Sequence, residues 1–76
     1  MTTELIREAT RDGQRVVRLR CYDGQNGNSL VEAEVTPLGG GETVKRGPYR
    51  FATAHEAFRF IQEAVLTLQY LGCAVG

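Results

Sequence analysis

The sequence predicts an α+β fold, an antiparallel meander of three to four strands followed by one long C-terminal helix packed on one face as a two-layer sandwich. Three observations predict it: a capped amphipathic helical stretch near the end, alternating strand patterns before it, and turn sequences between them. The chain has 76 residues and is expected to form a single domain, 1–76. A chain of this size buries only roughly 60% of its unfolded surface, so its core is limited to about one sheet and one helix.

The helix is expected from Thr53 to Leu71. Thr53 and Glu56 have the spacing of a capping box, in which each side chain takes up a free backbone N–H of the first turn. Gly72 suits the left-handed position that follows many helices. Apolar residues recur at helical spacing and predict the face that covers the sheet, namely Ala54, Ala57, Phe58, Ile61, Ala64, Val65 and Leu68.

The first half of the chain is expected to form two strands. Residues 3–10 also fit a helical turn, but the Asp12-Gly13 pair favours a tight hairpin, so 4–10 is interpreted as an edge strand. The second strand is 15–22, followed by a turn over 23–28 that is rich in glycine and asparagine. Its alternation predicts two faces, with Val17, Leu19 and Cys21 on one and Arg18, Arg20 and Tyr22 on the other.

Two more strands, 30–36 and 43–52, precede the helix. Gly47-Pro48 interrupts the fourth, and because proline cannot donate to a sheet, that strand is expected at an edge, or bulged, or both. Residues 72–76 are expected to be a short apolar tail. The inward positions are predicted as Val31, Ala33, Val35, Tyr49 and Phe51, and the outward ones as Glu32, Glu34, Thr36, Arg46 and Arg50.

Composition excludes several classes of function. The formal net charge is zero, so no global field draws the chain to nucleic acid or to an anionic membrane. We expect no signal peptide, because residues 1–15 are charged and lack an apolar run, and no membrane span. Cys21 and Cys73 lie far apart, which favours reduced thiols in a cytoplasmic protein and leaves a disulfide or a redox role as the minor alternative. No metal site and no cofactor are expected.

The residues that could support catalysis do not form a recognisable site. His55, the only histidine, falls in the first helical turn, and no nucleophile can be assigned beside it. Glu32 and Glu34 are expected to pair with arginines of neighbouring strands, which makes them poor acid–base partners. The glycines at 39–41 precede a strand, whereas a phosphate loop precedes a helix. We therefore expect a protein that is not an enzyme.

The outward face of the sheet offers one candidate site, for nucleic acid. Arginines beside an aromatic residue are the usual means of phosphate contact and base stacking. A solvated ladder of paired charges is the competing interpretation, because Glu32 and Glu34 share this face. The candidate nucleic-acid-binding residues are Arg18, Arg20, Tyr22, Arg46 and Arg50.

The run GPYRFATAHEAFRFIQEA, residues 47–64, resembles the junction between last strand and helix in plant ethylene-response-factor DNA-binding domains. It is also similar to the arm-binding domains of phage integrases. The resemblance implies three strands and a helix, with the sheet laid in the major groove of DNA. It would make the outward arginines the DNA contacts, that is Arg18, Arg20, Arg46 and Arg50.

The helix carries more apolar residues than one buried face requires. Leu66 and Tyr70 are one turn apart and fall on the far side of the helix, next to an already wide apolar arc. Scattered surface apolar residues are the alternative. We expect a small interaction module that forms a homodimer through its helix, and the residues assigned to self-association are Phe60, Leu66, Tyr70 and Leu71.

Overall fold

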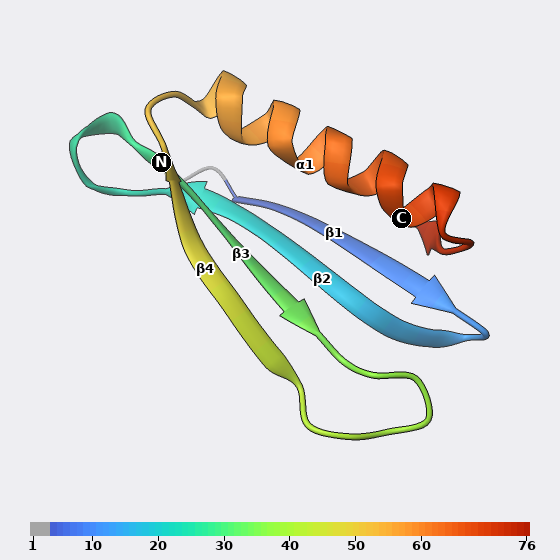
Figure 1. Cartoon of the computed structure of the whole chain (residues 1–76). Helices are drawn as coiled ribbons and strands as arrows, with labels where there is room; N and C mark the ends of the chain where they lie inside the picture. Colours follow the sequence, from blue (N-terminus) through green and yellow to red (C-terminus); the bar gives the residue numbers. More distant parts are fainter. Residues whose placement is uncertain (1–3) are drawn as a thin grey trace.

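The computed structural model describes residues 4–76, and it confirms the α+β two-layer fold, with one open antiparallel sheet and one C-terminal helix packed on it. Thr3, which begins the ambiguous N-terminal segment, lies outside the described residues. The order of strands across the sheet is β4-β3-β2-β1-β5 (Figure 1). The elements are β1 Glu4–Arg11, β2 Gln14–Asp23, a short 3-10 turn Gln25–Gly27, β3 Ser29–Val35, β4 Val44–Phe51, helix α1 Ala54–Tyr70 and β5 Ala74–Val75.

Glycine and its neighbours form the first two turns, as the sequence predicts. Asp12 and Gly13 have φ values of 53° and 79° and join β1 to β2. This pair of positive φ values is typical of hairpin turns whose twist matches that of the flanking strands. Asn26 and Gly27, with φ of 59° and 77°, turn the chain between β2 and β3. The ambiguous segment is therefore a strand.

The predicted tail is a fifth strand, which corrects two expectations. Ala74 and Val75 pair antiparallel with Thr10 and Ala9, so β1 lies between β2 and β5 and is not an edge strand. The backbones of Glu8 and Gly76 also exchange hydrogen bonds of 3.3 Å and 3.0 Å. A two-residue strand is too short to show an alternating pattern, so the sequence contains no signal for it.

Strand β4 is both an edge strand and irregular, as Gly47-Pro48 predicts. The register between β3 and β4 shifts between Val31 and Ala33, and the Gly47-Pro48 peptide bond is cis. A Cβ on Gly47 would lie 2.7 Å from the carbonyl oxygen of Val31, so only glycine fits there. Because of this shift, the residues of β4 that precede Gly47-Pro48 lie on the opposite face of the sheet from the one that simple alternation would give them.

Helix α1 begins and ends at the residues that its caps predict. Thr53 is the N-cap, and its Oγ1 accepts a hydrogen bond of 3.2 Å from the backbone N–H of Glu56. After the helix, the N–H of Gly72 donates to Gln69 O and the N–H of Cys73 donates to Leu68 O. With Gly72 at φ 96°, these two bonds form a Schellman motif. The chain then reverses directly into β5.

The core lies between the centre of the sheet and one face of α1. Its buried members are Leu19, Cys21, Val31, Ala57, Ile61 and Val65. Two helix residues that we expected to cover the sheet, Ala54 and Phe58, are instead exposed. Both lie in the first two turns of α1, where they border a cavity that is also lined by Cys21, Asp23 and Ser29 of the sheet.

Helix α1 crosses the sheet diagonally. It follows β4 at one edge and leads into β5 at the other, so each end lies over a different side of the sheet (Figure 1). A helix is about 10 Å wide and strands are about 4.8 Å apart, so one helix covers about two strands at any point. The end of β3 and the start of β4 extend away from the helix (Figure 1).

Candidate functional site

The outer face of the sheet, the face away from α1, carries interleaved charges. Cross-strand pairing brings Arg18 between Glu8 and Glu34, and Arg20 between Ile6 and Glu32. The charged residues of this outer face are Glu4, Glu8, Arg15, Arg18, Arg20, Glu32, Glu34, Lys45 and Arg50.

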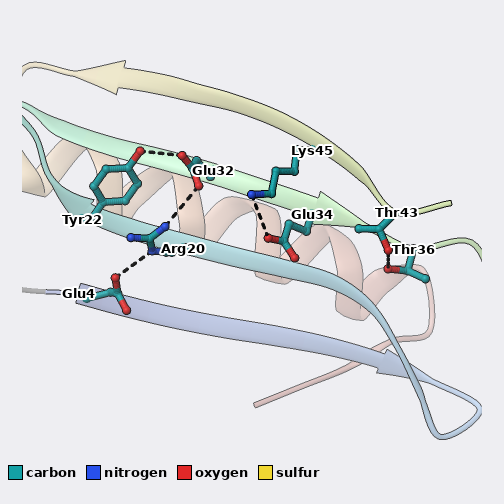
Figure 2. Close-up of polar contacts among 8 residues, drawn as sticks. All are labelled: Glu4, Arg20, Tyr22, Glu32, Glu34, Thr36, Thr43 and Lys45. Atoms are coloured by element: carbon teal, nitrogen blue, oxygen red, sulfur yellow. Dashed lines mark hydrogen bonds and ion pairs between the residues drawn. The ribbon is translucent and has the colours of Figure 1, made fainter.

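Arg20 and Tyr22 belong to a connected polar cluster (Figure 2). The Arg20 guanidinium lies 2.8 Å from a Glu4 oxygen and 3.5 Å from a Glu32 oxygen. The Tyr22 hydroxyl donates a hydrogen bond of 2.7 Å to Glu32, and the Arg20 guanidinium carbon lies 4.5 Å from the Tyr22 ring centre. The hydrogen bond to Glu32 holds the phenolic proton and raises the pKa of Tyr22. Both predicted nucleic-acid contacts are therefore already engaged.

The other carboxylates of the outer face are also ion-paired. Glu8 lies 2.7 Å from Arg15, and Glu34 lies 3.8 Å from Lys45 (Figure 2 shows the second pair). Arg18 differs, because its Nε is buried and has no hydrogen-bond partner among residues 4–76. Most of this face is thus a ladder of paired charges, whereas Arg18 at its centre and Arg50 at its edge make no ion pair with the other described residues.

The two predicted contacts on β4 lie on opposite faces. Arg50 is paired with Leu30 on the outer face, as expected. Arg46 is paired with Ala33, on the helix side of the sheet, so its predicted outward position is wrong. The register shift at Gly47-Pro48 inverts the alternation, and Lys45 takes the outer position opposite Glu34. The structure therefore does not bring Arg46 together with Arg18 and Arg20.

The residues predicted for self-association lie on two different sides of α1. At about 100° per residue, Tyr70 is opposite the buried Ile61, and Leu66 is close beside it. Leu66 is 59% exposed and Tyr70 is 91% exposed, and we call this pair the outer ridge. Phe60 and Leu71 point sideways, about a quarter turn from Ile61. The Phe60 ring packs 5.2 Å from Phe51, so it contributes to the helix–sheet contact.

A second apolar surface lies on the helix side of the sheet, beyond the reach of α1. Val35 and Val44 pair across β3 and β4 and are 41% and 40% exposed, and Tyr49 is 44% exposed. Arg46 lies between Val44 and Tyr49 on the same strand and face. We call these four residues the open corner. The sequence predicts Val35 and Tyr49 as inward residues, which is confirmed, but it does not show that the helix leaves them uncovered.

Other candidate chemistry is not assembled in the described part of the chain. Within residues 4–76, no group of three or more His, Cys, Asp or Glu residues is arranged to hold a metal ion. No helix in this range is long and apolar enough to cross a membrane. Cys21 is buried and Cys73 half-buried, and both thiols are unpaired. His55 is exposed at the start of α1.

Comparison with known proteins leaves the chain without a family assignment. No protein-family model, no curated protein and no solved structure matches it.

Proposed function

We propose that this protein is a non-enzymatic interaction module that self-associates through apolar surface on the helix side of its sheet. The observation that carries the proposal is the outer ridge: Leu66 and Tyr70 are i,i+4 neighbours and are the two most exposed large apolar residues of the helix. A lone exposed apolar residue is ordinary in a monomer, but a contiguous patch marks an interaction site. The open corner adds apolar surface on the same side of the molecule.

Energetics support association for a chain of this size. Burying one large apolar side chain is worth roughly 1.5–3 kcal/mol. A 76-residue domain has a small core, and oligomerisation is one of the usual ways in which such domains gain stability. A net charge of zero removes long-range repulsion between copies.

The non-enzymatic part of the proposal is supported by the outer face. Glu4, Glu8, Glu32 and Glu34 are each held in an ion pair with a basic side chain, so their oxygens are already engaged within the protein. The exposed His55 has no nucleophile assigned to it. The proposal requires no cofactor.

We also propose a cytoplasmic location, because Cys21 and Cys73 are unpaired and a reducing compartment keeps thiols in that state.

Light scattering at tens of micromolar tests self-association. We expect the wild type to be a dimer and Leu66→Glu with Tyr70→Glu to be a monomer. The matched control is Gln62→Glu with Gln69→Glu, which adds the same charge at exposed positions on the flank of α1 opposite Phe60. A control that also dissociates would show that charge alone breaks the dimer, and a monomeric wild type would refute the proposal.

Nucleic-acid binding by the outer face is a second candidate, favoured by one observation. Arg18 is a cation at the centre of that face whose Nε has no acceptor among the described residues. Arg50, at the edge of the same face, would provide a further contact to the phosphates of a bound nucleic acid. This candidate predicts that Arg18→Ala with Arg50→Ala abolishes binding to single- or double-stranded DNA at low salt.

Arg46→Ala is the matched control for the DNA titration, because Arg46 lies on the opposite face. Glu32→Gln with Glu34→Gln should tighten binding by removing repulsion of phosphate. The dependence of affinity on salt should also weaken as phosphate contacts are lost. Binding that persists in the Arg18 and Arg50 double variant would exclude this face.

A further inference from the structure

We infer that the self-association is a two-fold dimer in which the outer ridge of each copy, Leu66 and Tyr70, packs into the open corner of the other. The inference rests on the proposed self-association and specifies its contact surfaces. The open corner consists of Val35, Val44, Arg46 and Tyr49. Both surfaces lie on the helix side of the sheet, so one two-fold axis can bring both contacts into the same interface.

The open corner is an uncovered part of the sheet beside α1, against which a second helix can pack. Helix α1 crosses diagonally from the β4 edge to the β5 edge and covers about two strands at a time. The uncovered corner is flanked by the side of α1 that carries Phe60, whose ring lies 5.9 Å from the ring of Tyr49. A ridge of apolar side chains one helical turn apart fits such a corner, and the outer ridge of this chain has that spacing.

The exposed area and the shape of the monomer both favour a partner. The chain exposes 5286 Å², whereas a compact monomer of 8.4 kDa exposes about 4600 Å². The monomer therefore leaves roughly 700 Å² more surface open than a compact protein of its mass. The radius of gyration is 12.8 Å, against about 11 Å for a compact domain of this length.

Charge in the open corner complements charge beside the outer ridge. Arg46 makes no ion pair or hydrogen bond with any of residues 4–76, although it lies among apolar neighbours. Glu63 and Arg59 both border Leu66 and Tyr70 on the helix surface, and they form an exposed i,i+4 pair of 3.5 Å with each other, so Arg46 of a partner copy would compete with Arg59 for Glu63. In the proposed dimer, Arg46 of one copy approaches Glu63 of the other, which fixes the relative orientation of the two surfaces.

The sheet edges are poorer interfaces. Edge strand β4 contains Pro48 and a register shift, and both disrupt pairing with another strand. At the opposite edge, the two-residue strand β5 pairs only with Ala9 and Thr10, so the open part of β1 beside it is short, residues 4–7. An open head-to-tail chain would leave one outer ridge and one open corner exposed, whereas the two-fold arrangement closes both with only two copies.

Two variants with complementary charges test the pairing of these surfaces. Val44→Glu places a carboxylate in the open corner, and Leu66→Lys places an ammonium on the outer ridge. Each variant alone should dimerise about tenfold or more weakly than the wild type, because a charge would be buried against an apolar surface. Mixed together, they should form a heterodimer, since one of the two contacts then pairs the introduced carboxylate with the introduced ammonium and the other contact is wild type. Sedimentation equilibrium and native mass spectrometry measure both effects.

Matched controls use the same substitutions elsewhere. Ile6→Glu changes an exposed apolar residue on the outer face, and Gln69→Lys changes an exposed residue on the flank of α1 opposite Phe60. Both should dimerise like the wild type. Circular dichroism establishes that each variant is folded. If Val44→Glu is unfolded, Arg46→Glu replaces it, mixed with Glu63→Arg, and the same heterodimer is expected.

The outcomes separate this inference from the proposed function. A wild type that is monomeric at every concentration overturns both. A wild-type dimer that Leu66→Lys dissociates and Val44→Glu does not would support self-association through the helix and overturn the pairing with the open corner. A mixture of the two variants that forms no heterodimer would overturn it as well.

Discussion

The ring of Phe60 lies 5.9 Å from the ring of Tyr49, and this contact marks the boundary between the covered and uncovered parts of the helix side of the sheet. On one side of it, Phe51 and Val31 pack beneath α1. On the other side, β4 continues through Arg46 and Val44, which are exposed. The boundary follows from the diagonal path of the helix, and it explains why inward-facing apolar residues remain open to solvent.

The N-cap should contribute measurably to stability. Thr53→Ala removes the acceptor for the Glu56 N–H, and loss of such a cap typically costs about 1 kcal/mol. Urea denaturation at one fixed protein concentration measures the effect. Thr67→Ala is the control, because Thr67 is exposed within the helix and alanine favours helix formation there. Equal midpoints for the wild type and Thr53→Ala would mean that the cap contributes nothing.

The C-terminal turn should require glycine. Gly72 has φ 96°, so Gly72→Ala should destabilise the protein by about 1 kcal/mol through backbone strain. The variant should also loosen β5, since the turn directs Ala74 and Val75 back to β1. Hydrogen exchange of the Gly76 amide, which donates to Glu8 O, reports this loosening. Gly76→Ala is the control, and a Gly72→Ala protein as stable as the control would contradict the account of the turn.

Tyr22 should link stability to high pH. Its pKa is raised above 10.0 by the hydrogen bond to Glu32, so this bond stabilises the fold below pH 10.0 and its contribution is lost as pH rises through the higher pKa. Ionisation of Tyr22 can be followed by ultraviolet absorbance, as the part of the absorbance change that is missing in Tyr22→Phe. Its midpoint should lie above pH 10.0. Glu32→Gln should lower that midpoint, because the carboxylate that repels the phenolate is gone. A midpoint unaffected by Glu32→Gln would contradict the assignment.

The two thiols should differ in reactivity. Burial raises the pKa of Cys21, and the nearby Asp23 adds to the effect, so its reactive thiolate is scarce at neutral pH. Cys73 is only half-buried. Alkylation with iodoacetamide in mildly alkaline buffer, followed by peptide mass mapping, should modify Cys73 first in the folded protein. In urea the difference should disappear. Faster modification of Cys21 would contradict its buried position.

Local sequence signals predicted most of the fold. Asp12-Gly13 located the first hairpin, Thr53 and Gly72 located the ends of the helix, and alternation assigned the faces of β2 and β3. Each of these signals depends on backbone preferences or side-chain spacing within a few residues. The structure therefore has the turns, helix ends and strand faces that these local signals predict.

The features that the sequence did not predict depend on longer-range geometry. Strand β5 exists because the Schellman turn directs the chain onto β1, and two residues carry no periodic signal. Arg46 lies on the helix side because the register between β3 and β4 shifts. The alternation of residues along β4 does not reveal where this shift occurs. The open corner results from the direction in which α1 crosses the sheet, since Val35 and Val44 have the same pattern as buried residues.

Sedimentation equilibrium of the wild-type protein over a concentration series up to tens of micromolar tests self-association most directly. For a dimer, we expect an apparent mass that rises with concentration toward twice the 8.4 kDa of the chain and levels off there. A mass that stays at 8.4 kDa throughout would contradict it, and so would a mass that continues to rise beyond the dimer.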